Sequence, residues 1–198
     1  DLAPHQMHPM ELISQGKGNT DLISGYTSSS IGISEQVTLN VGVNAQVLTL
    51  NNSWALEPRA GIKWQFSPKS SFALAYGLHS RMEKMDVYFV KTQGTGDRSV
   101  NKDLGFTRAH HVMLSYGFKI SDNMNMKIEP YFQQLYDVPV IADSSYSVLN
   151  RRDFYVENVL VNRGKGRNIG VDITLERYLN KGLYYMMTAS IFDSKYYG

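Results

Sequence analysis

The feature that most constrains this chain is the alternation of large apolar side chains with small ones along short segments. In SSFALAYGLHS, residues 70–80, the large side chains of Phe72, Leu74 and Tyr76 are separated by alanine and glycine. Successive side chains of a β-strand point to opposite faces, so this segment is bulky and apolar on one face only. A soluble sheet is expected to place polar or charged side chains on its second face. The segment therefore predicts a strand whose faces meet two unusual environments.

The same period of two recurs along most of the chain and predicts an all-β fold. In residues 37–47 the valines, a leucine and an alanine alternate with Thr, Asn, Gly and Gln. The other alternating segments span residues 22–33, 60–66, 111–120, 125–132, 168–176 and 184–194. We count about eight strands. The best helix candidate, residues 10–18, is short and contains glycine, so we expect no long helix.

The connections between the expected strands alternate between short and long. Short turns rich in Pro, Asn, Asp, Ser and Gly are expected near residues 34–35, 67–69, 121–123 and 180–182. The longer links are NNSW (residues 51–54), residues 81–108 and residues 143–166. In an antiparallel up-and-down meander, all short turns then fall at one end. Outer-membrane barrels have this asymmetry, with short periplasmic turns and long extracellular loops.

The alternation and the asymmetry together predict that the bulky face contacts lipid and the small, polar face lines a lumen. No apolar run approaches the roughly 18 residues of a transmembrane helix, whereas a mean hydropathy of -0.30 is compatible with a barrel. Aromatic residues near the short turns, namely Trp64, Phe66, Phe118, Tyr178 and Tyr184 or Tyr185, are expected to form an interfacial girdle. The alternative is the core of a soluble β-sandwich, because Tyr and Phe favour strands in general.

The order of segments over residues 20–198 resembles the C-terminal part of the barrel of TonB-dependent receptors, particularly those of Bacteroidetes-like outer membranes. ALEPRAGIKWQF resembles the family's Pro-Arg strand, with Pro58 and Arg59, and NKDLGFTR resembles its Asn-x-x-Leu loop before a strand. MKIEPYFQQLYDVPV resembles the strand in which a Glu precedes paired aromatics. The residues that match the Asn-x-Gly…Gly-Val-Asp segment are Asn162, Gly164, Gly170, Val171 and Asp172.

This resemblance implies a receptor of the outer membrane that imports a scarce nutrient of the siderophore, vitamin, glycan or peptide class. The implied partners are outer-membrane lipid, the imported ligand, and TonB acting through a plug domain. No plug or TonB-box is recognised, the chain ends in SKYYG, and a complete barrel of this kind has about 22 strands. We therefore expect residues 1–198 to form a partial barrel domain, with residues 1–19 as a loop or leader and the plug outside. The alternatives are a small eight-stranded outer-membrane barrel and a soluble β-sandwich binding protein. The mild inner faces favour a wide lumen.

Composition and motifs exclude several other functions. The net charge of +2, with interspersed signs, provides no basic arm for nucleic acid, and the absence of cysteine excludes thiolate metal sites. His5 and His8 lie near Met7 and Met10 but lack a third ligand, so no metal site is expected. His110 and His111 should point to opposite faces. No catalytic set is recognised, so we expect neither an enzyme nor a cofactor.

The two long loops, residues 84–107 and 144–166, are expected to hold any ligand contacts, since loops on a rigid barrel carry recognition. Aromatic and Arg side chains dominate binding hot spots. The candidate ligand-binding residues are Tyr146, Arg151, Arg152, Phe154 and Tyr155. Arg163, Lys165 and Arg167 add to the basic concentration of Arg151 and Arg152; these cations are either solvated loop charges or contacts for an anionic substrate or lipopolysaccharide phosphate. GKGRNIG is not a dinucleotide motif, and its glycines are expected to form a bulge or a strand entry.

Overall fold

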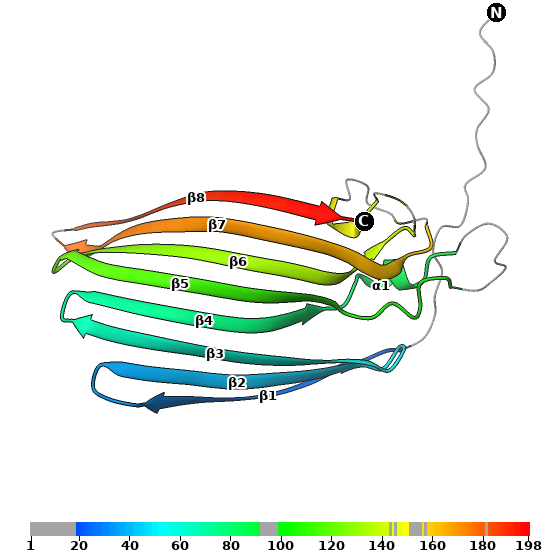
Figure 1. Ribbon diagram of the computed structural model, residues 1–198, viewed down its shortest axis with the longest axis horizontal. Helices are drawn as coiled ribbons and strands as arrows, with labels where there is room; N and C mark the ends of the chain where they lie inside the picture. The colour runs from blue at the N-terminus through cyan, green and yellow to red at the C-terminus, as the bar shows by residue number, and fades with distance from the viewer. Residues whose placement is uncertain are drawn as a thin grey trace, which may run out of the picture.

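The computed structural model describes residues 19–91, 99–142, 144, 146–150, 156, 158–180 and 182–198. It forms one antiparallel sheet in which every strand pairs with the next along the chain (Figure 1). The eight strands are β1 (Leu22–Gly32), β2 (Val37–Leu48), β3 (Ser53–Ser67), β4 (Ser70–Arg81), β5 (Thr107–Ser121), β6 (Met124–Val140), β7 (Val161–Asn180) and β8 (Leu183–Tyr197). Two short helical segments, α1 (Met85–Tyr88) and the 3₁₀ turn η1 (Val148–Asn150), lie in the connections. The predicted meander of about eight strands is confirmed.

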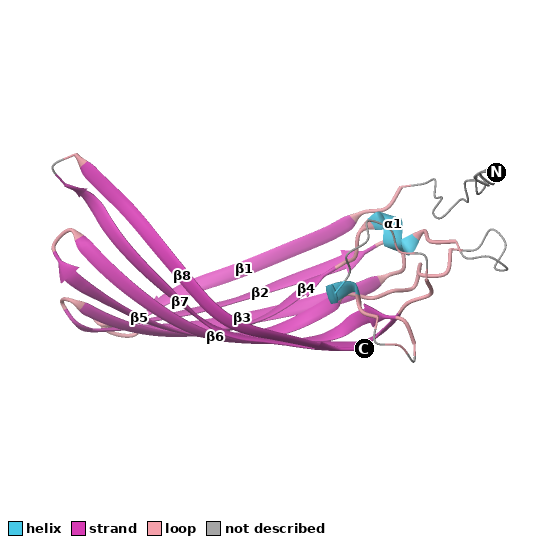
Figure 2. Ribbon diagram, turned by 90° about the horizontal axis from the view of Figure 1, so that it is seen from above, coloured by secondary structure: helices cyan, strands magenta, loops and turns pink. Residues whose placement is uncertain are grey.

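The sheet is open and curved. Strands β1 and β8 are its two edges and do not pair with each other over the part of the chain that the structure describes. In Figure 2 both edges stand on the same side of the middle strands, which gives the sheet a concave and a convex face. A closed eight-stranded barrel would pair its edges, and a sandwich would need a second sheet. Both alternatives are therefore wrong, and the chain forms an arc.

The connections separate by length as predicted. Residues 33–36, 68–69, 122–123 and 182 lie at one end of the sheet, which we call the short-turn end. The described residues of the other connections, 49–52, 82–91, 99–106, 141–142, 144, 146–150, 156 and 158–160, lie at the other end, the long-loop end. The short turns are closed by local features of the chain. The Val37 amide donates to the Ser34 carbonyl at 3.3 Å, and Gly182 adopts a φ of 80°. No helix among the described residues is long and apolar enough to cross a membrane.

The expected loop at residues 144–166 is too long, because β7 already begins at Val161. The register between β6 and β7 shifts between Leu135 and Val138, so β6 contains a bulge, and Asp137 within it has a φ of 54°. Gly164 pairs with Val138 beside this bulge, where a Cβ would overlap Val140 Cγ1 and the Val138 carbonyl oxygen. The glycine here permits the close approach of two strands. The expectation of a bulge is confirmed, but the segment is strand.

Candidate functional site

The buried core of the molecule lies at the long-loop end, where two loops pack against the inner face of the sheet. We call this unit the cap. Its buried residues come from the ends of β2 and β3 and from the two long loops: Leu48, Ala55, Val87, Tyr88, Val90, Leu104, Phe106, Val156 and Leu160. Side chains from both loops share one apolar cluster, so the loops form a single packed unit at this end of the arc.

Asn101 joins the two loops through their backbones. Its side chain is 1 % exposed, its Nδ2 donates to the Asn158 carbonyl at 3.0 Å, and its Oδ1 accepts from the Leu160 amide at 2.8 Å. A buried amide that satisfies both its donor and its acceptor stabilises one arrangement of its surroundings. Asn101 is the Asn of the Asn-x-x-Leu motif, so the motif has a structural role at the junction of the loops.

Two further asparagines tie the cap to the sheet. Asn51, in the β2–β3 turn, donates to the carbonyls of Lys102 and Leu104 at 3.0 and 2.7 Å. Asn162, at the start of β7, accepts from the Gly105 amide at 2.9 Å and donates to the Asp137 carbonyl at 2.7 Å. The first long loop is thereby held to three separate elements.

The helical segment α1 brings Tyr88 into the cap. Tyr88 is 0 % exposed, and its hydroxyl accepts from the Glu83 amide at 3.2 Å. Burial raises the pKa of Tyr88 above its ordinary value of 10.0. This segment was not predicted from the sequence, although the apolar run VYFV at residues 87–90, inside an expected loop, is a signal for burial.

Below the cap, the inner face carries a hydrogen-bonded carboxylate. The pairing of β3 with β4 ends at Arg59–Gly77. Beyond that end, the Glu57 side chain accepts a hydrogen bond of 2.8 Å from the Ser80 amide. Glu57 is 6 % exposed and also accepts from Gln46 at 2.8 Å and Asn44 at 2.9 Å. The carboxylate thus bridges β2 and β4 where the β3–β4 pairing ends, next to the family-like Pro-Arg pair.

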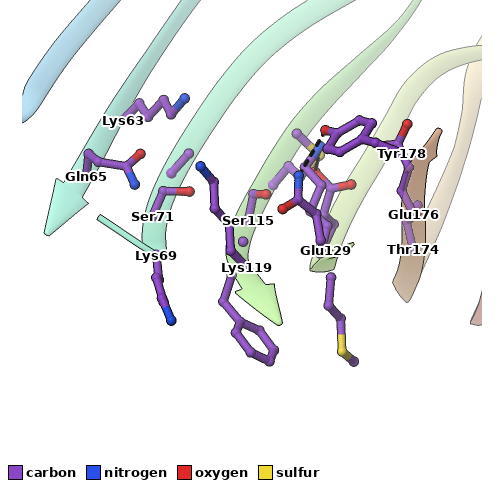
Figure 3. A pocket seen from close by; sticks show the side chains of 17 residues that line it. Lys63, Gln65, Lys69, Ser71, Ser115, Lys119, Glu129, Thr174, Glu176 and Tyr178 are labelled. Atoms are coloured by element: carbon purple, nitrogen blue, oxygen red, sulfur yellow. Dashed lines mark hydrogen bonds and ion pairs between the residues drawn. The ribbon is translucent and has the colours of Figure 1, made fainter. Parts of the chain in front are cut away.

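Nearer the short-turn end, the concave face is hollowed into a groove with a volume of about 590 Å³, which we call the inner groove (Figure 3). The groove is lined mainly by polar side chains from β3 to β7, among them Lys63, Lys119, Glu129 and Glu176. Lys127 and Glu129 form an ion pair of 2.8 Å at its wall. Glu129 and Glu176 therefore face the inside of the arc, which is the face predicted to line a lumen, and Asp172 shares that face because it pairs with Glu129. The charged wall suits a hydrated lumen or a polar partner.

The convex face carries two aromatic groups. At the short-turn end the Trp64 and Phe66 rings lie 5.3 Å apart, and Tyr116 stacks with Phe66 at 6.4 Å and with Phe118 at 6.2 Å. Trp54 lies twelve residues before Phe66 on the same face of β3. At about 3.3 Å per residue and a strand tilt of about 40°, these two side chains are separated by roughly 30 Å along a membrane normal, which matches a hydrocarbon core.

Toward the long-loop end the convex face carries a second stack. His110 Nδ1 lies 2.9 Å from the Tyr76 hydroxyl, and the His110 ring stacks on Tyr136 at 5.2 Å. The large exposed apolar residues between the two groups include Ile62, Leu74, Val112 and Leu114. This is the apolar band between aromatic girdles expected of a barrel exterior. One predicted girdle residue is wrong: Tyr178 lines the inner groove, because it shares the strand face of Thr174 and Glu176.

The candidate ligand-binding residues divide into two groups. Tyr146 is half-buried, packs against the cap, and its carbonyl accepts from the Ile141 amide at 3.2 Å. The other four, Arg151, Arg152, Phe154 and Tyr155, lie outside the described residues, as do His5 and His8 with Met7 and Met10. The ligand role of all five candidates stays a prediction.

The histidines follow the predicted geometry. His110 belongs to the convex stack, whereas His111 lies on the concave face, edge-on to His79 at 6.2 Å and to Tyr131 at 6.1 Å. No group of three or more His, Cys, Asp or Glu side chains within the described ranges could hold a metal ion.

The comparisons with solved structures agree with this geometry. The iron transporter FrpB from Neisseria meningitidis (F3-3 variant) matches 89% of this chain with a TM-score of 0.61 and 16% identity. The outer membrane transporter YddB from Escherichia coli matches 89% with a TM-score of 0.67 and 16% identity, and the ferric-catecholate import receptor Fiu from E. coli K12 matches 87% with 0.60 and 12%.

This chain spans about a quarter of those proteins: 26% of FrpB, 25% of YddB and 28% of Fiu. No protein-family model and no curated protein sequence matches it. The fold is therefore that of an arc of an outer-membrane transporter barrel, as the alternation and the segment order predicted. All three structural neighbours are transporters or receptors.

Proposed function

We propose that this chain is part of the barrel wall of an outer-membrane receptor-transporter that imports a scarce nutrient. The observation that carries the proposal is the two-faced arc, with an apolar convex face between aromatic groups and a charged concave face below a packed cap. The likeness to three outer-membrane transport structures supports it. An enzymatic function has no comparable support. In water, the large apolar convex face would promote aggregation.

In this proposal the cap end recognises the nutrient. The long loops are extracellular by the loop-length rule of outer-membrane barrels, and they are seated on a rigid sheet. We propose Tyr146, Arg151, Arg152, Phe154 and Tyr155 as the ligand contacts of this segment. The nutrient belongs to the siderophore, vitamin, glycan or peptide class. FrpB and Fiu, named for transport of iron and of ferric catecholate, make an iron complex the first compound to test.

The remaining machinery lies outside the 198 residues in this proposal. A plug domain of the same receptor occupies the lumen and contacts the inner groove, whose lysines and glutamates can pair with a polar protein surface. Energy reaches the plug through TonB. Residues 1–198 then form one partial barrel domain of the receptor.

The test is uptake by a strain that lacks the receptor and is complemented with the complete gene. Cell-associated label is measured for a ferric catecholate, cobalamin, an oligosaccharide and a peptide, after fractionation shows where the protein resides. The variant with all five candidates changed to Ala should lose most of the uptake that the wild-type gene restores. A matched variant with five exposed polar residues of the short-turn end changed to Ala should keep it.

Two outcomes contradict the proposal. A protein that fractionates with the soluble contents of the cell refutes the membrane assignment. An outer-membrane protein whose five-Ala variant transports normally refutes the ligand contacts.

A further inference from the structure

The convex face of β7 changes character along its length. Lys165 and Arg167 alternate on the face that continues as Ile169 and Val171 toward the short-turn end, and Arg163 lies two residues before Lys165, at a second register shift between β6 and β7. Arg163 and Lys165 are exposed, and Ile169 is 49% exposed. The sequence allowed two interpretations of these three cations: solvated loop charges, or contacts for an anion. Since they lie in a strand, directly above an apolar stripe, they are not loop charges.

Neighbouring strands extend this group into a belt. Lys195 of β8 pairs in register with Arg167, and Arg108 of β5 lies toward the same end of the sheet. We call these five residues the basic belt: Arg108, Arg163, Lys165, Arg167 and Lys195.

Two carboxylates partly balance the basic belt. Asp193 lies 3.2 Å from Lys195 and 3.9 Å from Arg167, and Asp137 lies 3.9 Å from Arg108. Arg163 and Lys165 make no ion pair with any residue that the structure describes. The belt therefore has three more cations than carboxylates, from five against two, and its exposed members Arg163 and Lys165 have no carboxylate partner among the described residues.

The other end of the convex face is different. Among the described strand residues, Arg177 is the only cation on that face near the short turns, where it pairs with Met124 and Tyr185. The lysines of that end, Lys63, Lys69, Lys119 and Lys127, line the inner groove instead. Within the described part of the chain, the excess of outward cations is thus confined to the long-loop end.

We propose that the basic belt binds the phosphate groups of a phosphorylated glycolipid in the outer leaflet of the membrane. The inference rests on the proposed function, which places the long-loop end outside the cell. Charge complementarity and position identify the ligand: the anion must lie beside the barrel, at the level where the acyl chains covering Ile169 and Val171 end. A lipid headgroup meets both conditions, whereas a soluble substrate passes through the lumen on the other face. Arginine binds phosphate bidentately, and Lys binds it as a point charge.

The experiment uses the complete receptor, purified and reconstituted into vesicles of zwitterionic phospholipid. Lipopolysaccharide is added with its phosphates intact or enzymatically removed, and the retained glycolipid is measured by mass spectrometry. The test variant is R163Q/K165Q/R167Q, and the matched control is K63Q/K119Q/K127Q on the concave face. Heat-modified gel mobility shows that each variant is folded. R163K/R167K, which keeps the charge, serves as a second variant if the triple variant fails to fold.

Wild-type receptor and the concave-face control should retain phosphorylated lipopolysaccharide equally. The triple variant should bind it about one to two orders of magnitude more weakly, because each cation near an anionic lipid surface contributes about fivefold. Dephosphorylated lipopolysaccharide should bind weakly to all three, and millimolar inorganic phosphate should not compete.

Three results overturn the inference: equal retention by the triple variant, equal binding of the dephosphorylated lipid, or displacement by inorganic phosphate, which indicates a free-phosphate site. If R163K/R167K has to replace the triple variant, its binding must stay within a few fold of wild type; a full loss would indicate a role other than charge. A receptor that does not enter vesicles at all refutes the proposed function instead, so the two failures are distinguishable.

Discussion

Replacing Asn101 with Ala should open the cap without melting the sheet. The change removes the acceptor of the Leu160 amide, and this buried amide is left unsatisfied. It also removes the donor to the carbonyl of Asn158, but Asn158 is exposed and its carbonyl can bind water instead. An unsatisfied buried amide costs about 1–3 kcal/mol, and a replaceable hydrogen bond about 1 kcal/mol. The free energy of local opening of the cap should fall by about 2–4 kcal/mol.

The assay is hydrogen exchange of the complete receptor in detergent, followed peptide by peptide. A loss of about 2–4 kcal/mol corresponds to exchange roughly 30- to 1000-fold faster. The acceleration should be confined to the cap peptides covering residues 82–91, 99–106 and 158–160, because local openings occur in cooperative units. The β4 and β5 strand amides should exchange as in wild type.

Asn40→Ala is the matched control, because Asn40 is exposed on β2 and its side chain makes no hydrogen bond with a described residue. It should leave exchange in the cap unchanged. Unaltered exchange in the Asn101 variant would show that the loops are held by apolar packing alone. Acceleration throughout the sheet would show that the cap is not a separate cooperative unit.

Three further predictions test the two faces, the buried phenol and the strand contact. Leu114→Arg, on the convex face, should reduce the stability of the membrane-inserted receptor by about 2–4 kcal/mol, whereas Ser115→Arg on the inner face should change it by less than about 1 kcal/mol; equal effects in urea titration would refute the assignment of the faces. Because burial raises the pKa of Tyr88, its contribution to cap stability should be intact below the unfolded pKa of about 10 and fall as the pH rises through the higher folded value; the Tyr88→Phe cap should resist this alkaline opening in hydrogen exchange. Gly164→Ala should cost about 1–3 kcal/mol through overlap with Val140 and the Val138 carbonyl, while Gly25→Ala, with nothing within 4 Å, should be neutral in the same unfolding titration.

The strands and their faces were predictable because a strand in a barrel has only two environments. Phe72, Leu74 and Tyr76 lie on the convex face, and Glu129 and Glu176 face the groove. Both placements follow from parity, the rule that every second residue of a strand points to the same face. The error at Tyr178 came from weighing its nearness to a turn above its parity. Parity is a local rule, and it was the better guide.

The cap was not predictable in the same way, because its contacts join segments that no period connects. The burial of Tyr88 depends on apolar side chains from β2, β3 and the second long loop. The start of β7 was missed because Gly164 and Gly166 suggest a loop until the bulge in β6 is known. These features depend on tertiary packing that one segment does not encode.

The asparagine ties of the cap have a consequence for how the arc assembles. Each strand pairing joins two consecutive strands, whereas the cap bonds join elements that are not consecutive along the chain. Asn51 in the β2–β3 turn binds the carbonyl of Lys102, between β4 and β5, and Asn101 binds the amide of Leu160, just before β7. Bringing such elements together costs chain entropy, and the paired strands between them have already met that cost. The hairpins can therefore zip together one after another from either edge, but the cap can close only when β2 to β7 already stand in register. A closed cap thus reports that the wall beneath it is correctly built, and a register slip in any of six strands would leave it open.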